Sequence, residues 1–280
     1  MNTIKLKSML EQFYIEDIGD GDLSSDYLFP VSVMGELSFI AKMDGVFCGN
    51  QVIEYGLQVI DTTLSVVCHV EDGDLVEQGT VIATASGSVG SLLKSERVIL
   101  NLIQRMSAIA TETDRVVKKI SGTGTKVVDT RKTMPGLRML DKYAVRTGGG
   151  FNHRNGLFDA VMLKDNHLAF AGSISKAVET VRAAIGHTVK IEVEIESFEQ
   201  LQEAVEAKAD IIMFDNCTPE MIKEWKKSVP DTIITEASGM ITNDTIRAYA
   251  ESGVDYISLG YLTHSVKALD ISANVRIETH

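Results

Sequence analysis

The stretch VKIEVEIESFEQLQEAVEAKADIIMFDNCTPEMIKEWKKSVPDTIITEASG, residues 189–239, repeats one pattern. Short apolar runs end at Glu194, Asp215 and Glu236. Each run is followed along the chain by a segment with apolar residues at helical spacing. Strands that alternate with helices indicate βα units, which form a parallel sheet through right-handed crossovers. This stretch therefore predicts an α/β fold.

The alternation continues on both sides of this stretch. Further strand-like runs lie at 125–129, 160–164 and 254–260, and further helix-like runs lie at 173–186 and 242–253. Six strand-like runs are fewer than the eight of a complete α/β barrel. We therefore predict an open, incomplete α/β barrel, with an open doubly wound sheet as the structural alternative.

Several of the expected helices begin with residues that favour a helix start. These starts are Ser197 with Gln200, Thr218 with Pro219, and Thr242 with Thr245. Glycines at 186 and 253 mark two of the expected helix ends.

Charged or polar residues follow each expected strand. In a parallel barrel the carboxyl ends of all strands lie on one rim, where residues from distant parts of the chain meet. The residues are Asp129 with Arg131 and Lys132, Lys164, Glu194, Asp215, Glu236, and Gly260 to His264. This arrangement predicts a polar rim that binds an anionic substrate.

The first third of the chain has a different pattern. Runs at 36–49, 62–70 and 80–88 are strand-like and are separated by turn dipeptides, which predicts an antiparallel layer. A helix is expected at 51–60, and a long helix at 92–120 is expected to join this part to the barrel.

Composition excludes several classes of protein. The 280 residues are 44% hydrophobic and 24% charged, which is typical of a folded chain with one or two cores. The formal net charge of -12 argues against general binding to nucleic acid or to an anionic membrane. The three cysteines are scattered without a CxxC pair, so neither a disulfide framework nor a zinc site is expected, and a reducing cytoplasm fits best.

Basic residues are concentrated in the middle of this acidic chain. They are Arg131, Lys132, Arg138, Lys142, Arg146, His153, Arg154 and Lys164. A basic interior pocket in an acidic protein predicts recognition of a small polyanion.

The segment DTRKTMPGLRMLDKYAVRTGGGFNHRNGLFDAVMLKDNH, residues 129–167, closely resembles the signature of the quinolinate phosphoribosyltransferase family. Members of this family are also called nicotinate-nucleotide pyrophosphorylase (carboxylating). Further blocks resemble the family in the same order at 16–26, 95–111, 191–197, 214–216, 236–239 and 262–272. The resemblance therefore covers nearly the whole chain.

This resemblance implies a reaction and an architecture. Quinolinate and phosphoribosyl pyrophosphate would give nicotinate mononucleotide, pyrophosphate and carbon dioxide, with magnesium, in de novo NAD biosynthesis. The implied fold is an N-terminal α/β sandwich, placed here at 1–110, followed by a seven-stranded open α/β barrel at 111–280, from which the last residues can return to the first domain. The implied assembly is a homodimer with shared active sites, which can assemble further.

Quinolinate carries two carboxylates, so its site requires cations, preferably arginines whose planar fork binds a carboxylate through two hydrogen bonds. Arg131, Arg154 and Lys164 are the candidates, with His153 beside them. The resemblance adds Lys132 to the pocket and implies that Arg97 reaches in from the neighbouring subunit.

Magnesium favours carboxylate and phosphate oxygens, and Glu194 and Asp215 stand where the resemblance implies metal and ribose contacts. Glu192 and Glu196 alternate with Glu194 and share its face of the strand. Which of the three glutamates is the main site residue therefore depends on where the strand stops. The sugar phosphate requires backbone N–H groups, which loops at strand ends supply. The candidate phosphate-binding residues are Ser238 with Gly239 and Gly260 with His264, and Gly148 to Gly150 form either a further phosphate loop or a hinge.

The site assignment contains two groups of residues. Catalysis is assigned to Lys132, Lys164, Glu194 and Asp215, of which the last two are also the metal ligands. Substrate binding is assigned to Arg97, Arg131, Lys132, Thr133, His153, Arg154, Lys164, Glu194, Asp215, Ser238, Gly239, Gly260 and His264.

The chain departs from the family pattern at a few uncharged positions. Met134 stands where Thr is common, Thr147 where Cys is frequent, Met240 where Gly is usual, and Tyr261 where a small residue is usual. Three other hypotheses remain open. They are a molybdenum-transport-associated paralogue of the same fold, a Schiff-base aldolase that uses Lys164, and a phosphosugar sensor without turnover.

Overall fold

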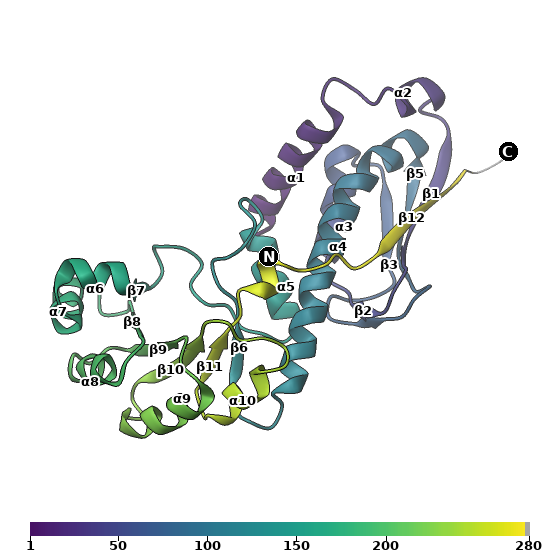
Figure 1. Cartoon of the computed structure of the whole chain (residues 1–280). Coiled ribbons are helices and arrows are strands. Elements are labelled where there is room, and N and C mark those ends of the chain that lie inside the picture. The colour runs from purple at the N-terminus through teal and green to yellow at the C-terminus, as the bar shows by residue number, and fades with distance from the viewer. Residues whose placement is uncertain (278–280) are drawn as a thin grey trace. The chain divides into compact units, whose positions relative to one another are not determined.

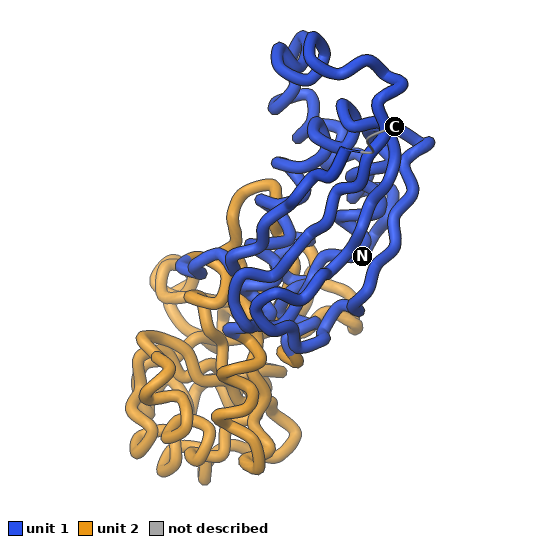
Figure 2. The backbone as a smooth tube through the Cα atoms, turned by 90° about the vertical axis from the view of Figure 1, so that its right-hand side faces the viewer, with its two compact units in different colours: residues 1–112, 139–148, 265–280 blue, residues 113–138, 149–264 orange. Residues whose placement is uncertain are grey.

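The computed structural model describes residues 1–277, which form two compact units (Figure 2). Unit 1 comprises residues 1–112, 139–148 and 265 onward, and unit 2 comprises residues 113–138 and 149–264. The long helix α4 (Val89–Lys119) runs from one unit into the other, as the apolar spacing at 92–120 predicted.

Unit 1 is built on an antiparallel sheet with the strand order β12-β1-β5-β3. The three runs expected to form an antiparallel layer supply its strands, which confirms that prediction, while β12 comes from the far end of the chain. Figure 1 shows α3 and α4 alongside this sheet. The elements are α1 (Thr3–Ile18), α2 (Ser25–Leu28), β1 (Met34–Ala41), β2 (Gly45–Val46), α3 (Asn50–Ile60), β3 (Ser65–Cys68), β4 (Leu75–Val76), β5 (Val81–Ser88), α5 (Arg138–Thr147) and β12 (Ile271–Ile277).

Close helix packing in unit 1 depends on one glycine. A Cβ at Gly56 of α3 would lie 2.7 Å from Ile99 of α4 and 3.0 Å from the hydroxyl of Tyr14 of α1. The absence of a side chain at this position lets the three helices approach one another. Burial also raises the pKa of the Tyr14 phenol, whose hydroxyl donates to the Ser95 carbonyl.

Unit 2 is built on a parallel sheet of six described strands, in the order β6-β11-β10-β9-β8-β7. The six strand-like runs form these six strands, which confirms the open α/β barrel. Figure 1 shows α8, α9 and α10 along one side of the sheet. The elements are β6 (Lys126–Val128), β7 (Val161–Leu163), α6 (Asp165–Ala171), α7 (Ile174–Ala184), β8 (Ile191–Ile195), α8 (Phe198–Glu206), β9 (Ile211–Asp215), α9 (Pro219–Trp225), η1 (Lys226–Ser228), β10 (Ile234–Ser238), α10 (Ile246–Glu251), β11 (Tyr256–Ser258) and α11 (Tyr261–His264).

The barrel opens between β6 and β7, which follow each other in sequence but do not pair. The chain between them contains α5, of which residues 139–147 belong to unit 1. The sheet has six strands among the described residues, one fewer than the resemblance implied, and a single parallel bridge joins Val128 of β6 to Phe151.

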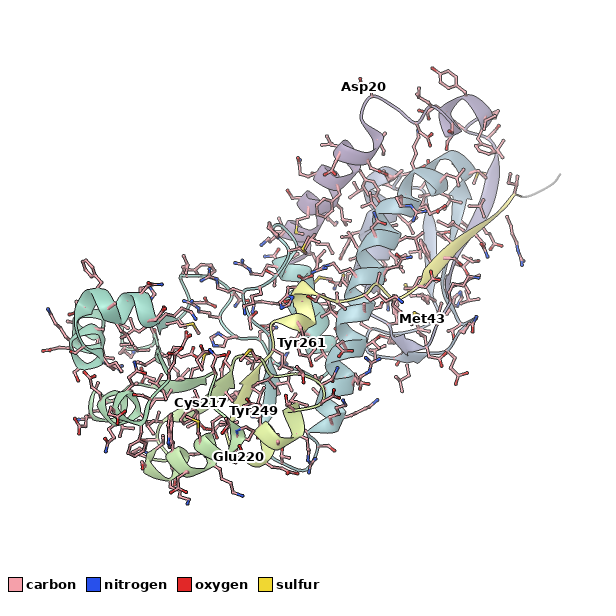
Figure 3. The ribbon with its side chains drawn as sticks, viewed as in Figure 1. Asp20, Met43, Cys217, Glu220, Tyr249 and Tyr261 are labelled. Carbon is pink, nitrogen blue, oxygen red and sulfur yellow. The ribbon has the colours of Figure 1, made fainter. Side chains whose placement is uncertain are left out.

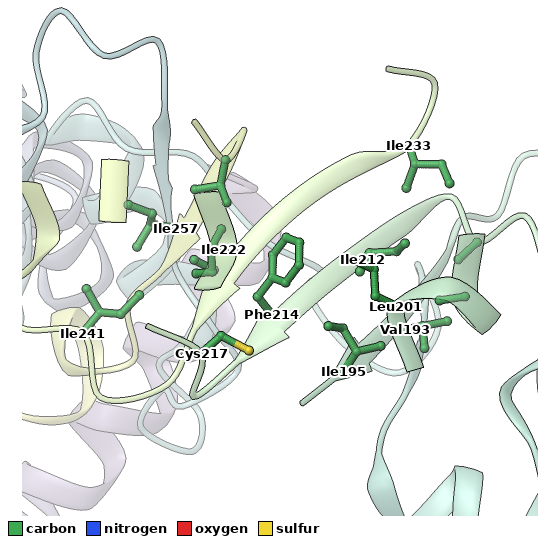
Figure 4. Packing of buried hydrophobic residues seen from close by; sticks show 14 of the residues in the cluster. Val193, Ile195, Leu201, Ile212, Phe214, Cys217, Ile222, Ile233, Ile241 and Ile257 are labelled. Carbon is green, nitrogen blue, oxygen red and sulfur yellow. The ribbon is translucent and has the colours of Figure 1, made fainter. Parts of the chain in front are cut away.

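The core of unit 2 lies between the sheet and its helices. Val193 of β8, Ile212 and Phe214 of β9, and Ile257 of β11 are all fully buried (Figure 4). Trp225 of α9 packs its ring 6.5 Å from that of Phe214, measured between ring centroids. Burial of aromatic and branched side chains on both sides of the strands stabilises the parallel sheet.

The expected helix starts have mixed outcomes. Ser197 and Gln200 form a capping box, and Thr218 accepts a hydrogen bond from Met221 N just before Pro219. The start expected at Thr242 is wrong, because Thr242 and Thr245 hydrogen-bond to each other in a turn and α10 begins at Ile246. Within residues 1–277 no helix is both long and apolar enough to span a membrane.

Candidate active site

A cavity of about 750 Å³ lies in unit 2 at the carboxyl ends of the parallel strands. Most of the assigned site residues line it, although they are spread over more than 130 positions of sequence. The assigned residues in its lining are Arg131, Lys132, His153, Arg154, Lys164, Glu194, Asp215, Ser238, Gly239, Gly260 and His264. The carboxyl ends of parallel strands therefore bring these groups together, as expected for a barrel.

Two assigned residues do not line this cavity. Thr133 accepts a hydrogen bond from Arg138 Nε at 3.1 Å. Arg97 is on α4 in unit 1, with a side chain that is 58% exposed and a nitrogen 3.5 Å from Glu96. Only part of the basic middle segment lines the cavity, because Arg138, Lys142 and Arg146 are absent from its lining.

Lys164, Glu194 and Asp215 form a charged group at the ends of β7, β8 and β9. The Lys164 ammonium donates a short hydrogen bond to the Glu194 carboxylate. Burial raises the pKa of Asp215 to about 6, and the negative charge and hydrogen bond of Glu194 act in the same direction, opposed by Lys164. Two adjacent carboxylates that repel each other suit a hard divalent cation, so the residues present fit magnesium.

Arg131 and Arg154 place two guanidinium groups in the same cavity. Burial lowers the pKa of Arg154, and the positive charge of Arg131 adds to this effect. Arg154 Nη1 donates to the Ala160 carbonyl at 3.3 Å, and its Nη2 lies 3.7 Å from the sulfur of Met162. Two neighbouring cations in a partly desolvated cavity favour a ligand with more than one negative charge.

Lys132 lies against the turn after β11. The Thr263 hydroxyl donates to the Lys132 carbonyl at 2.8 Å, and a Cβ at Gly260 would lie 2.8 Å from Lys132 Cδ. Tyr261, labelled in Figure 3, follows Gly260 at the start of α11 and also lines the cavity. Glycine at position 260 therefore allows the Lys132 side chain to lie close to this turn.

The loop after β10 is tightly constrained. Gly239 has φ +90° and a Cβ there would lie 2.2 Å from Asn216 Oδ1, so no other residue fits. Met240 follows with φ 50° and is 86% exposed. The side chain that departs from the family pattern therefore occupies a left-handed backbone conformation that glycine favours.

The three glutamates around the end of β8 differ in position. Glu194 lines the cavity near the strand end, whereas Glu192 lies deeper and is 1% exposed. Its neighbours there are His153 and Glu236, whose contacts are described below. Glu196 lies beyond the strand and is exposed.

The site assignment left out a second layer of residues, of which only Glu236 was expected at the polar rim. Met162, Met213, Glu236 and Ser258 line the cavity, and each lies two positions before an assigned residue. Alternate residues of a strand face the same side, so period two predicts this layer once each strand end is known. Thr130, Asn216, Met240, Ile241, Thr242 and Tyr261 complete the missed part of the lining and come from loops or a helix start.

An α/β barrel whose strand ends combine clustered cations with paired carboxylates defines an enzyme that acts on small polyanions. Residues 109–274 match the model of the quinolinate phosphoribosyl transferase C-terminal domain, and residues 22–107 match that of the N-terminal domain. The chain belongs to the quinolinate phosphoribosyltransferase family.

Individual relatives agree with the family models. The chain is 51% identical over 277 residues to a probable nicotinate-nucleotide pyrophosphorylase (carboxylating) of Bacillus subtilis, covering 99% of this chain and 96% of the relative. Among solved structures, NadC from Streptococcus pyogenes has a TM-score of 0.95 at 38% identity, covering 100% and 99% of the two chains. The nicotinate-nucleotide pyrophosphorylase from Francisella tularensis has a TM-score of 0.93 at 36% identity, covering 99% and 98%.

Proposed function

We propose that this chain transfers the phosphoribosyl group of phosphoribosyl pyrophosphate to quinolinate and releases carbon dioxide, in de novo NAD biosynthesis. The products are nicotinate mononucleotide, pyrophosphate and carbon dioxide. The observation that carries the proposal is that two guanidiniums and two carboxylates line one cavity. They belong to Arg131, Arg154, Glu194 and Asp215. Family membership, shown by the models that match residues 22–107 and 109–274, supports it.

The cations bind the dicarboxylate. Arg131 and Arg154 supply planar donor groups, and Lys164 supplies an ammonium at the end of β7. A guanidinium fork binds a carboxylate with two parallel hydrogen bonds, which fixes the plane and orientation of the pyridine ring. That orientation directs the ring nitrogen toward the ribosyl carbon.

The acidic and phosphate-binding residues hold the sugar pyrophosphate. Backbone groups after β10 and β11, at Ser238 with Gly239 and at Gly260, receive the sugar phosphate. A Mg²⁺ ion held by Glu194 and Asp215 would neutralise charge on the pyrophosphate leaving group. Lys132 lies in the same cavity and adds a positive charge for that group.

The chemistry requires no covalent intermediate with the enzyme. The pyridine nitrogen attacks the ribosyl carbon as pyrophosphate departs, and the nearby carboxylates stabilise positive charge that develops on the sugar. The bond between the carboxylate and the ring carbon next to the quaternary nitrogen then breaks and carbon dioxide leaves. The electron pair stays on that ring carbon, where the adjacent positive charge stabilises it, and the carbon takes a proton. The protein therefore contributes mainly orientation and electrostatic stabilisation.

We further propose a homodimer in which Arg97 enters the partner's cavity. Arg97 is an exposed cation of unit 1 that does not line the cavity of unit 2. The apolar side chains of Leu157, Phe158 and Phe170 are at least 77% exposed, which is consistent with a surface that a second subunit covers.

A reducing cytoplasm is the proposed location, supported by the three free cysteines.

The test is an assay of both products. The purified protein is incubated with Mg²⁺, phosphoribosyl pyrophosphate and ring-carboxyl-labelled quinolinate, with nicotinate as a parallel substrate. Equal amounts of labelled carbon dioxide and nicotinate mononucleotide, with nicotinate inert, are expected. Tight binding of the sugar pyrophosphate without turnover would instead favour the sensor or the paralogue, and borohydride trapping of Lys164 with a carbonyl substrate would favour the aldolase.

A further inference from the structure

A buried cluster of His153, Glu192 and Glu236 adjoins the cavity in unit 2. His153 Nε2 lies 3.0 Å from Glu192 Oε2 and 3.6 Å from Glu236 Oε2. Glu192 is 1% exposed and Glu236 is 3% exposed, and neither carboxylate oxygen of Glu192 has a hydrogen-bond partner among the described residues. The assigned catalytic steps do not use either glutamate.

By distance alone this cluster could hold a metal ion, since its ligand atoms lie within 4.8 Å of one another. The other ring nitrogen argues against that use. The backbone N–H of Arg154 donates to His153 Nδ1 at 2.7 Å, so Nδ1 is an acceptor and the ring hydrogen is on Nε2. A histidine that binds metal through Nε2 carries its hydrogen on Nδ1 instead.

The cluster is therefore a chain of close contacts that leads to Arg154. The Glu192 carboxylate lies 3.0 Å from His153 Nε2, and His153 Nδ1 accepts a hydrogen bond from the backbone N–H of Arg154. The fully buried Asp129 holds the same segment from the other side, because it accepts from His153 N at 2.8 Å and from Asn152 Nδ2 at 2.6 Å. One ring nitrogen of His153 thus accepts a backbone hydrogen bond, and the other lies beside the Glu192 carboxylate.

We propose that Glu192 is a positioning residue that holds Arg154 toward the acidic substrate through the His153 ring. This inference rests on the proposed function. The negative charge of a carboxylate attracts a nearby N–H group more strongly than a neutral oxygen does, and burial strengthens this attraction. His153 then acts by fixing the backbone of Arg154, and its loss has the same consequence as the loss of Glu192.

The test compares substitutions of similar volume at position 192. Glu192→Met removes the carboxylate and leaves the site filled, whereas Glu192→Gln keeps an oxygen beside His153 Nε2. Glu192→Met is expected to raise the KM for quinolinate about tenfold, because the His153 ring loses the negative charge that holds it. The KM for phosphoribosyl pyrophosphate should change little, and Glu192→Gln should recover most of the loss.

A double-mutant cycle tests the route through the histidine. His153→Phe alone should raise the KM for quinolinate, and adding Glu192→Met to it should have little further effect, because both act through one contact. Glu206→Ala, at an exposed position on α8, is the control and should match the unaltered protein.

Several results would overturn the assignment. They are full additivity in the cycle, equal losses for both substrates, or a Gln variant as impaired as the Met variant. An unaltered protein that does not convert quinolinate would refute the proposed function. An active unaltered protein from which Glu192→Met is indistinguishable would refute only the role of Glu192.

Discussion

Replacing Glu236 by glutamine should change how the stability of unit 2 depends on pH. Glu236 is 3% exposed on β10, and burial raises its pKa from 4.5 to about 8, with the charge of Glu192 acting in the same direction. Asp129 adds to this effect, whereas His153 opposes it. Between these two pKa values the folded state keeps a proton that the unfolded chain has released.

The sign and size of the effect follow from this proton. Because the native state binds more protons, the free energy of unfolding falls as pH rises, by up to about 1.4 kcal/mol per pH unit. From pH 5 to pH 8 the loss attributable to Glu236 amounts to at most about 4 kcal/mol. Glu236→Gln removes this loss, so the variant should resemble the unaltered protein at pH 5 and be clearly more stable at pH 8.

The chain provides a suitable probe for this measurement. Trp225 is the single tryptophan and packs against Phe198 and Phe214 in the core of unit 2. Urea unfolding followed by its fluorescence at several pH values reports on that unit, with Glu251→Gln at an exposed position as the control. A stability difference between Glu236→Gln and the unaltered protein that stays constant from pH 5 to pH 8 would refute the reasoning.

Three further predictions concern the site and its loops. Arg97→Ala and Lys164→Ala should each be nearly inactive, and mixed dimers should regain part of the activity in the product assay; no recovery from demonstrably mixed dimers would contradict a shared site. Asp215→Ala should weaken magnesium-dependent turnover more than quinolinate binding measured by calorimetry, and equal losses would argue against its metal role. Met240→Gly should leave the free energy of unfolding unchanged or raise it by up to about 1 kcal/mol, because Met240 has φ 50°. Met134→Gly, at a position where φ is not positive, should lower the free energy of unfolding in urea titrations. A similar loss at both positions would show that the backbone of Met240 is not strained.

The strands of unit 2 and their terminal residues were predictable because both depend on local pattern. Apolar runs with β-branched residues define each strand, and parallel pairing brings their carboxyl ends to one rim. Lys164, Glu194 and Asp215 therefore meet although no two are neighbours in sequence.

Other features depend on long-range packing that no local pattern contains. The basic residues at 131–164 form one run in sequence, but Lys142 and Arg146 lie on α5, within unit 1. The position of Glu192 below Glu194 required knowledge of where β8 stops, since alternation alone places both on the same face. The turn at Thr242 was mistaken for a helix start because threonine hydroxyls favour both structures.

The sheet of unit 1 has a consequence for the order in which the protein can fold during synthesis. Strand β12 pairs with β1 along its whole length, yet all of unit 2 separates the two strands in sequence. While the ribosome makes unit 2, β1 must present an unpaired edge, which other chains can bind. We therefore expect nascent chains that end before Ile271 to depend on chaperones or to aggregate, although most of unit 1 has already been made.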